Sequence, residues 1–318
     1  MKQARLAILG AGAVGRSVLE LAGDYGHSVV AVADSETAAV DAEGLDTEAV
    51  LERKAARGVV GDHDVAAALD ADYDVLVEAT PTTLGDAEPG FSHVERALEA
   101  DRHVVLANKG PVAERYDDLR ALEADSAGSV RFEATVGGAI PALSTIEDMD
   151  PSHVTRVRGI LNGTANFVLS RMAAEGLDYE HVLAEAQDLG VAEADPSFDV
   201  EGTDAALKCV IVANELYGGG YTLADADVEG IENIPGSALE LAAEDGRTVR
   251  LVGEVSGGEV RVGPRLVPEH GTLAVSGTMN IVQIETEHAG PLAISGHGAG
   301  GPETASAVLA DVGRLPQP

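Results

Sequence analysis

A lysine within an apolar helical pattern is the first residue of this chain that could do proton chemistry. Residues 205–213 are almost wholly apolar, Lys208 is their single charge, and Asp204 lies one helical turn earlier on the same face. A buried ammonium is costly unless a carboxylate pairs with it or a site uses it. The alternative is an ordinary surface ion pair, which contributes roughly 0.3–0.5 kcal/mol. Further carboxylates precede this helix, at Glu193, Asp195, Asp199 and Glu201.

A glycine motif near the N-terminus predicts a nucleotide-binding site. An apolar strand pattern at residues 5–9 runs into GAGAVG (10–15), and a helical pattern follows at once. Strand, G-x-G-x-x-G and helix in this order form the dinucleotide fingerprint. The first glycine makes the tight turn, the second lets backbone approach a pyrophosphate, and the third lets helix and strand pack closely. The phosphates would lie at the helix N-terminus. The candidate contacts are Gly10, Gly12, Ala13, Val14 and Gly15.

An acid ends the second strand pattern. Residues 28–33 lead to Asp34, about 20 residues past the glycines, where a carboxylate can bind the ribose hydroxyls of the adenosine. Asp34 would repel a 2′-phosphate, which favours NAD over NADP. The preference would weaken if Arg53, Lys54 and Arg57 fold back towards the same pocket. A turn or helix cap is the alternative role for Asp34.

Lysine usage points to a second catalytic candidate. The chain has four lysines, at positions 2, 54, 109 and 208, in a sequence whose other basic residues apart from histidine are arginines. Lys109 follows the strand pattern at 103–106 and would project from the carboxyl end of a strand toward the nicotinamide. Each retained lysine needs a reason, so the functional interpretation of Lys109 and Lys208 gains weight.

The remaining elements predict an α/β fold in two domains. Strand patterns at 75–78, 103–106 and 130–134 alternate with helical ones at 92–100 and 114–127, as in a Rossmann-type doubly wound parallel sheet. Thr80 lies just past one of these strands, at the ligand-binding edge. Residues 248–287 alternate apolar and polar positions, which indicates antiparallel strands.

We therefore expect a dinucleotide-binding domain over 1–134, completed by 296–318. A second, α+β domain over 135–295 would carry substrate binding, catalysis and dimerisation. Two glycine-rich turns lie at the borders of these domains. The turn at 133–141 could offer carbonyls to a monovalent cation or N–H groups to an anion, but a plain interdomain hinge is the interpretation that the residues alone favour. The turn at 296–302 precedes a helix and suggests that the chain returns to cover the cofactor.

Composition bounds the kinds of partner. The formal net charge is −33 and the acids are spread along the chain, so nucleic acid and anionic membranes would be repelled. Such a surface is typical of a cytoplasmic protein from a high-salt organism, where dissolved salt limits the repulsion between the acids to a few Å. The single cysteine, Cys209, excludes an internal disulfide and a Cys-based zinc site and fits a core position. No signal peptide or membrane span is expected.

Taken together, the motifs resemble the homoserine dehydrogenase family over nearly the whole chain. The longest of them, at 190–208, is the most specific. The resemblance implies reduction of L-aspartate 4-semialdehyde to L-homoserine with NADH or NADPH, on the route to threonine, methionine and isoleucine. It also implies a homodimer, and neither an ACT domain nor an aspartokinase segment is expected. The motifs are GAGAVG (10–15), ANKG (107–110), EATVGGAIP (133–141), GILNGTANF (159–167), GVAEADPSFDVEGTDAALK (190–208) and GAG with TA (298–305).

The resemblance also implies roles for individual residues. Glu193 and Asp204 would contact the amine and carboxylate of the substrate, with Asp199 in the same pocket. Thr80 and Gly300 match cofactor contacts. The turn at 133–141 is similar to the family's sodium site. Its ligands would be the carbonyl oxygens of Glu133, Val136, Gly138 and Ile140.

Our mechanistic hypothesis assigns the two lysines different tasks. Negative charge develops on the substrate oxygen during hydride transfer, and a cation there stabilises the transition state more than the ground state. We expect Lys208 to transfer the proton and Lys109 to act as the electrostatic helper. Two alternatives remain: another Rossmann dehydrogenase, such as aspartate dehydrogenase, and a non-catalytic NAD-sensing protein. The motif at 190–208 and the two lysines speak against them.

Overall fold

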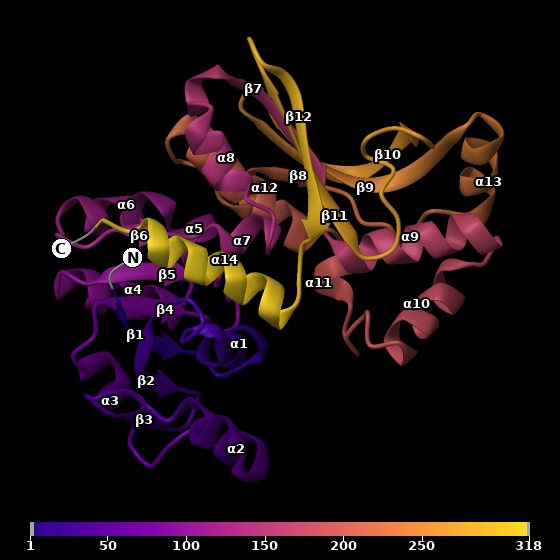
Figure 1. The fold of residues 1–318 in the computed structure, drawn as a ribbon. Coiled ribbons are helices and arrows are strands. Elements are labelled where there is room, and N and C mark those ends of the chain that lie inside the picture. Colours follow the sequence, from indigo (N-terminus) through magenta and orange to yellow (C-terminus); the bar gives the residue numbers. More distant parts are fainter. Residues whose placement is uncertain (1–2, 317–318) are drawn as a thin grey trace. The chain divides into compact units, whose positions relative to one another are not determined.

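A computed structural model describes residues 3–316 of the chain, which divides into two compact units (Figure 1). One unit comprises the chain up to residue 139 and again from residue 299, and the other comprises residues 140–298. The sequence analysis placed these borders at 134/135 and 295/296. The borders of the compact units therefore lie five and three residues further along the chain.

The first unit is built on a six-stranded sheet with the order β3-β2-β1-β4-β5-β6. All neighbours pair in parallel except β2 and β3, which are antiparallel. The expected α/β class with a Rossmann-type parallel sheet is confirmed. Its elements are β1 (Arg5–Leu9), α1 (Ala13–Leu21), β2 (Ser28–Ala33), β3 (Ala38–Val40), α2 (Thr47–Arg57), α3 (Ala66–Asp70), β4 (Val75–Glu78), α4 (Gly90–Glu99), β5 (His103–Leu106), α5 (Gly110–Glu114), α6 (Tyr116–Ala124), β6 (Val130–Arg131), α7 (Ala134–Gly137) and α14 (Gly301–Arg314).

The C-terminal helix belongs to the core of this first unit. Helix α14 packs beside α1, although nearly 300 residues separate them in the chain (Figure 1). Val308, Leu309 and Val312 are buried in one cluster with Leu6 and Ile8 of β1. Burial of apolar side chains from both ends of the chain thus stabilises the sheet. The chain therefore returns to the first unit through this helix.

Two local predictions for this unit were wrong. The strand expected at 130–134 is only Val130–Arg131, because Ala134–Gly137 form one turn of helix α7. The helix expected at 114–127 is shorter, because α6 covers only Tyr116–Ala124. The separate helix α5 ends just before it, and Arg115, whose φ of −131° is not helical, divides the two.

The second unit is built on another six-stranded sheet, with the order β12-β11-β7-β9-β10-β8. The antiparallel strands predicted within 248–287 are confirmed by the pairing of β9 with β10 and of β11 with β7. Strand β8 pairs in parallel with β10. The elements are α8 (Ala142–Asp148), η1 (Pro151–His153), β7 (Val154–Ile160), α9 (Gly163–Glu175), α10 (Tyr179–Asp188), α11 (Ser197–Val200), α12 (Thr203–Tyr217), η2 (Leu223–Asp225), β8 (Ala226–Val228), α13 (Gly236–Glu244), β9 (Arg247–Ser256), β10 (Glu259–Pro268), β11 (Met279–Thr286) and β12 (Gly290–His297).

Helix α12 is the buried centre of the second unit. Eleven consecutive residues, 204–214, are buried, so the helix is covered on all sides. Its ends are set by Gly202 and Gly218, which both adopt left-handed backbone conformations that favour glycine. The helix contacts β9 and β10. Within residues 3–316 we find no helix whose length and apolar character would let it span a bilayer.

Candidate active site

The lysine singled out by the sequence is buried and paired. Lys208 is 6% exposed and Asp204 is 7% exposed. The Lys208 Nζ lies 2.6 Å from Asp204 Oδ2 and donates to the carbonyl oxygen of Leu161 at 2.7 Å. The exposed surface pair considered above is therefore excluded. A buried ammonium held against a carboxylate is suited to exchange a proton with an oxygen of a bound substrate.

An asparagine that the sequence analysis missed joins two of the predicted acids. The Asn162 Nδ2 donates to Asp199 Oδ1 at 2.6 Å and to Asp204 Oδ2 at 3.0 Å. Its Oδ1 accepts from the backbone N–H of Ala165 and so caps helix α9. Asn162 thereby holds Asp199 and Asp204 on either side of one amide. The capping pattern N-G-T-A at the helix start was the signal that could have identified it.

A second missed residue shares the acceptor of Lys208. The Asn280 Nδ2 donates to the carbonyl of Leu161 at 2.9 Å, so that carbonyl binds both Asn280 and Lys208. Asn280 is 1% exposed, and a Cβ added at Gly298 would lie 1.9 Å from its Nδ2. Close packing against that glycine fixes the asparagine, which in turn fixes the orientation of the carbonyl.

The acidic loop before α12 enters this cluster only in part. Asp199 joins it through Asn162, whereas Glu193 and Asp195 have exposed side chains. Asp195 accepts from the backbone and hydroxyl of Ser197, which holds the pKa of that carboxyl below its usual value. The backbone carbonyl of Glu193 accepts from Gln187 at 3.1 Å. Glu193 stays a predicted substrate ligand.

Cys209 is a core residue, as expected. It is buried, and a Cβ added at Gly253 would lie 2.4 Å from its Sγ. Burial raises the pKa of the thiol to about 12, although the neighbouring Lys208 ammonium acts against that shift. The thiolate is therefore suppressed, and Cys209 packs as a small apolar side chain.

The glycine loop of the first unit has the geometry that the fingerprint requires. Gly10 has a φ of +97°, and a Cβ there would lie 2.3 Å from the carbonyl oxygen of Ala79. A Cβ at Gly15 would lie 1.7 Å from the carbonyl oxygen of Gly10. A Cβ at Gly12 would meet no atom within 4 Å among the described residues. Two glycines thus allow close packing, and the third leaves room for a ligand at the N-terminus of α1.

The second glycine-rich turn lies against this loop. A Cβ added at Gly301 would be 2.6 Å from Ser17 Oγ and 2.9 Å from the carbonyl oxygen of Ala13. Gly300 precedes α14 with a φ of +123°. The N-termini of α1 and α14 therefore meet, which places Gly300 beside the predicted phosphate-binding residues Ala13 and Val14.

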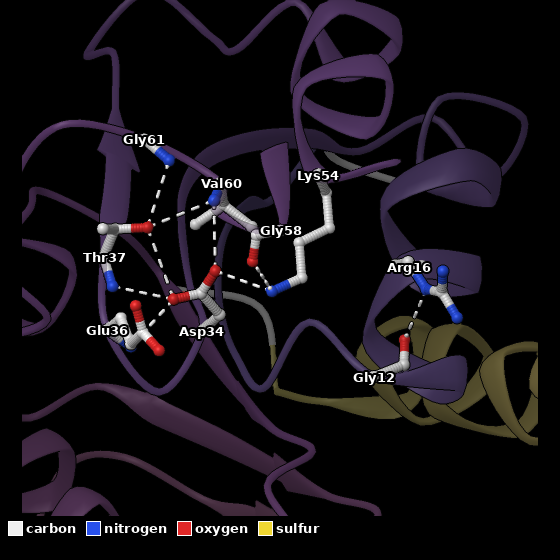
Figure 2. Close-up of polar contacts among 9 residues, drawn as sticks. All are labelled: Gly12, Arg16, Asp34, Glu36, Thr37, Lys54, Gly58, Val60 and Gly61. Atoms are coloured by element: carbon white, nitrogen blue, oxygen red, sulfur yellow. Dashed lines mark hydrogen bonds and ion pairs between the residues drawn. The ribbon is translucent and has the colours of Figure 1, made fainter. Parts of the chain in front are cut away.

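Asp34 lies at the end of β2, but its carboxylate is already occupied (Figure 2). Oδ1 accepts from the N–H groups of Thr37 at 2.7 Å and Glu36 at 2.9 Å. Oδ2 accepts from Lys54 Nζ at 2.8 Å and from Val60 N at 3.1 Å. Burial alone would raise the pKa of Asp34, but Lys54 and the backbone N–H groups hold it at about 2. The turn role left open for Asp34 is observed, and the carboxylate that was to repel a 2′-phosphate is neutralised by Lys54.

A second basic residue lies beside the glycine loop. Arg16, on the first turn of α1, donates from Nε to the carbonyl oxygen of Gly12 at 3.2 Å (Figure 2). Arg53, which the sequence placed among possible partners of this pocket, pairs instead with Asp62. Asp34 is thus bordered by Lys54, and Gly12 by Arg16.

The predicted coenzyme residues at the next strand ends form one network. Thr80 donates to the Glu78 carboxylate through its N–H at 2.9 Å and also through its hydroxyl. Asn108 Nδ2 donates to Thr80 Oγ1 at 3.1 Å, and Asn108 Oδ1 accepts from the N–H of Gly110. Lys109, held between these two residues, lies at the start of α5 and donates through its backbone N–H to Thr82 Oγ1.

The four carbonyls of the predicted sodium site belong to one short stretch of the chain, residues 133–140. Glu133 and Ile140 accept through their carbonyls from the N–H groups of Val136 at 3.3 Å and Ala142 at 2.8 Å. A carbonyl oxygen carries two lone pairs, so these bonds leave capacity for a cation. Gly138, with a φ of +56°, ends helix α7. The donor chemistry fits a hard monovalent cation.

Two protein-family models match different parts of the chain. The model described as homoserine dehydrogenase matches residues 141–312. The model described as glutamate/leucine/phenylalanine/valine dehydrogenase matches residues 1–86. The first match contains α12 with Lys208, and the second contains the glycine loop.

Two curated relatives match over nearly their full length. A homoserine dehydrogenase of Methanocaldococcus jannaschii is 39% identical over 96% of this chain and 96% of its own. An NAD(+)-dependent homoserine dehydrogenase of Pseudomonas canavaninivorans is 34% identical over 98% of this chain and 96% of its own.

Two solved structures are similar over the whole fold. A putative homoserine dehydrogenase from Archaeoglobus fulgidus has a TM-score of 0.91 and 40% identity, covering 98% of each chain. A hyperthermophilic archaeal homoserine dehydrogenase in complex with NADPH has a TM-score of 0.85 and 27% identity, covering 98% of this chain and 97% of that chain.

Proposed function

This chain belongs to the homoserine dehydrogenase family, and from that premise we propose how its residues divide the work. The reaction is the NAD(P)-dependent interconversion of L-aspartate 4-semialdehyde and L-homoserine. A bound coenzyme supplies or accepts the hydride. The residues of the chain must bind the amino-acid end of the substrate, hold the coenzyme and move one proton at the substrate oxygen.

Lys208 is the proton-transferring group. In the reduction direction its Nζ gives a proton to the oxygen that gains negative charge, and in the oxidation direction it takes the proton of the homoserine hydroxyl. The observation that supports this role is the buried contact of Lys208 with Asp204 at 2.6 Å and with the Leu161 carbonyl at 2.7 Å. These two acceptors fix the position of the ammonium, and fixed charges stabilise a transition state without reorganisation.

The acids beside Lys208 bind the ammonium of the substrate. Asp199 and Asp204 lie on either side of the Asn162 amide, which arranges two carboxylates for one cationic ligand. Glu193 is the third proposed substrate ligand. Lys109 is proposed as the electrostatic helper at the reacting oxygen.

The coenzyme preference that the structure supports is for NADP. The NAD preference inferred from the sequence required a free Asp34 carboxylate, but Lys54 and three backbone N–H groups occupy it. An ammonium has three N–H groups, and within residues 3–316 that of Lys54 donates to Asp34 and Gly58. Arg16 presents its guanidinium beside Gly12. Lys54 therefore offers a donor to a 2′-phosphate, and Arg16 offers one to a phosphate at the glycine loop. NAD would bind through the same loop with lower affinity.

Several finer predictions accompany this function. We propose a sodium ion at the carbonyls of Glu133, Val136, Gly138 and Ile140, which would order that turn. We also propose a homodimer, a cytoplasmic location, a role in making threonine, methionine and isoleucine, and activity that depends on high salt. The net charge of −33 supports the last of these, because counter-ions screen the repulsion among the acids.

The reaction is tested by the reduction of NAD⁺ and NADP⁺ with L-homoserine, in high and in low salt. The absorbance of the reduced coenzyme gives the rate. L-aspartate as the alternative substrate tests the aspartate dehydrogenase alternative. Oxidation of L-homoserine with a higher kcat/KM for NADP⁺ supports the proposal. Turnover of L-aspartate instead of L-homoserine would contradict it.

The division of labour between the lysines is tested by Lys208→Ala and Lys109→Ala, with Arg261→Ala, at an exposed basic residue of β10, as the variant outside the proposed chemistry. Loss of general acid–base catalysis lowers kcat by about 10²–10⁴-fold, and we expect that loss for Lys208→Ala. A smaller decrease is expected for Lys109→Ala. A Lys208→Ala enzyme with wild-type kcat and unchanged KM would show that the assignment is wrong.

A further inference from the structure

A carboxylate without an assigned role lies fully buried at the coenzyme edge of the first sheet. Glu78, the last residue of β4, is 0% exposed. Its Oε1 accepts from the Thr80 N–H at 2.9 Å, from the Thr80 hydroxyl and from Asn108 Nδ2 at 3.4 Å. Its Oε2 lies 2.8 Å from His93 Nδ1, on helix α4. One side chain therefore connects two loops and a helix.

Both loops that Glu78 connects carry proposed coenzyme or catalytic residues. The loop after β4 contributes Thr80, and the loop after β5 contributes Asn108 and Lys109. Asn108 uses its Nδ2 on Glu78 and Thr80, and its Oδ1 on the N–H of Gly110. The backbone on either side of Lys109 is thus fixed relative to the Glu78 carboxylate.

Fold stability alone does not account for an ionisable group at this position. A fully buried carboxylate is costly to desolvate, and a packed apolar side chain of similar volume is often as stabilising or more so. Within residues 3–316, His93 is the basic group within 4.0 Å of the Glu78 carboxylate, and its side chain is 13% exposed. What Glu78 provides that an apolar residue cannot is a set of directed acceptors for Thr80 and Asn108.

We propose that Glu78, held by His93, is the positioning residue for the coenzyme edge: it orients Thr80 and, through Asn108, the Lys109 backbone. This inference rests on the proposed roles of Thr80 and Lys109. Glu78 touches neither substrate nor coenzyme and acts through these neighbours. Its removal therefore weakens coenzyme binding and leaves the binding of homoserine, whose proposed ligands are on the other unit, unchanged.

The test compares Glu78→Leu with Glu78→Gln. Leucine keeps the volume but removes every acceptor. The dissociation constant for NADPH then rises by about tenfold, as expected if the displaced Thr80 loses one hydrogen bond to the coenzyme. Glutamine keeps one acceptor oxygen and restores part of the affinity. The dissociation constant is measured by titration of NADPH fluorescence without homoserine. Glu95→Gln, at an exposed residue of helix α4, which also carries His93, is the matched control.

The helix contact is tested by His93→Asn and His93→Ala. An Asn side-chain amide can place a donor near the position of the histidine Nδ1, so His93→Asn binds NADPH more tightly than His93→Ala. Thermal unfolding of each variant reports whether it is folded. A wild-type dissociation constant in folded Glu78→Leu would overturn the proposal, and so would an equal increase in the KM values for coenzyme and homoserine.

The NADPH titration also separates this inference from the proposed function. It measures binding without turnover. A wild-type protein that binds NADPH but does not oxidise homoserine would contradict the proposed function alone. Unchanged NADPH binding in Glu78→Leu, with normal oxidation of homoserine by the wild type, would contradict the positioning role alone.

Discussion

Replacing Lys54 by methionine separates two consequences of its contact with Asp34. Methionine keeps much of the side-chain length and removes the ammonium. If Lys54 binds the 2′-phosphate, the variant loses a hydrogen bond between charged groups, which contributes about 1.5–3 kcal/mol. That loss lowers kcat/KM for NADP⁺ by roughly 10–100-fold. The kcat/KM for NAD⁺ changes little, because NAD⁺ has no 2′-phosphate.

The same substitution affects stability through Asp34. The pKa of Asp34 is about 2, against an ordinary value of 3.8. At about 1.4 kcal/mol for each pKa unit, its contacts stabilise the fold by about 2 kcal/mol at neutral pH. Because the folded-state pKa is lowered, this stabilisation is present above pH 3.8 and is lost as the pH falls through 2. Lys54→Met removes the main favourable contact, so it costs up to about 2 kcal/mol at pH 7.

Initial rates with saturating homoserine give the two kcat/KM values, and urea unfolding at pH 7 gives the stability. Lys54→Arg, which keeps the charge, should retain the NADP⁺ preference. Arg57→Met removes a charge from the exposed end of the same helix α2 and serves as the matched control. An equal decrease of kcat/KM for NAD⁺ and NADP⁺ would refute the reasoning, because it would leave Lys54 with a structural role only.

Three further predictions concern buried polar groups. Asn162→Ala raises the KM for homoserine by about tenfold and leaves the KM for coenzyme unchanged, because Asp199 and Asp204 lose their shared donor; equal changes in both KM values would contradict this. Asp204→Asn leaves the Lys208 ammonium without its carboxylate and lowers the unfolding free energy, measured with urea, by about 3–5 kcal/mol. A decrease in unfolding free energy below about 1 kcal/mol, which is typical of exposed ion pairs, would count against burial of this pair. Burial raises the pKa of Asp311 to about 6. The unfolding free energy therefore decreases as the pH rises from 3.8 to 6, and Asp311 causes no further change above pH 6. Asp311→Asn removes this decrease, which urea unfolding at several pH values measures.

The features that the sequence predicted well depend on short spacings. The contact of Lys208 with Asp204 follows from residues four apart on one helix. The glycine loop follows from a strand, a turn and a helix within about 20 residues, where steric rules leave few conformations. In both cases the chemistry is fixed by neighbours in the sequence.

The features that it missed depend on contacts between distant segments. The sequence named Lys54 only as one of three basic residues that could fold back towards Asp34. It did not show that Lys54 and Val60, from the segment after β3, both bind that carboxylate. Asn280 reaches the carbonyl of Leu161, the neighbour of Asn162, because β7 and β11 pair. Glu78 looked like the polar end of a strand, since nothing local indicates that Asn108 and His93 converge on it. Hydrogen-bond partners across such separations are set by tertiary packing.

The position of helix α14 has a consequence for the order in which the chain folds during synthesis. The first unit needs this helix, because Val308, Leu309 and Val312 close the core around β1. The ribosome makes that segment only after the whole of residues 140–298. The second unit is one continuous segment and can fold as soon as it emerges, whereas the first must keep an apolar face uncovered until residues 301–314 have been made. The nucleotide-binding half is therefore begun first and completed last.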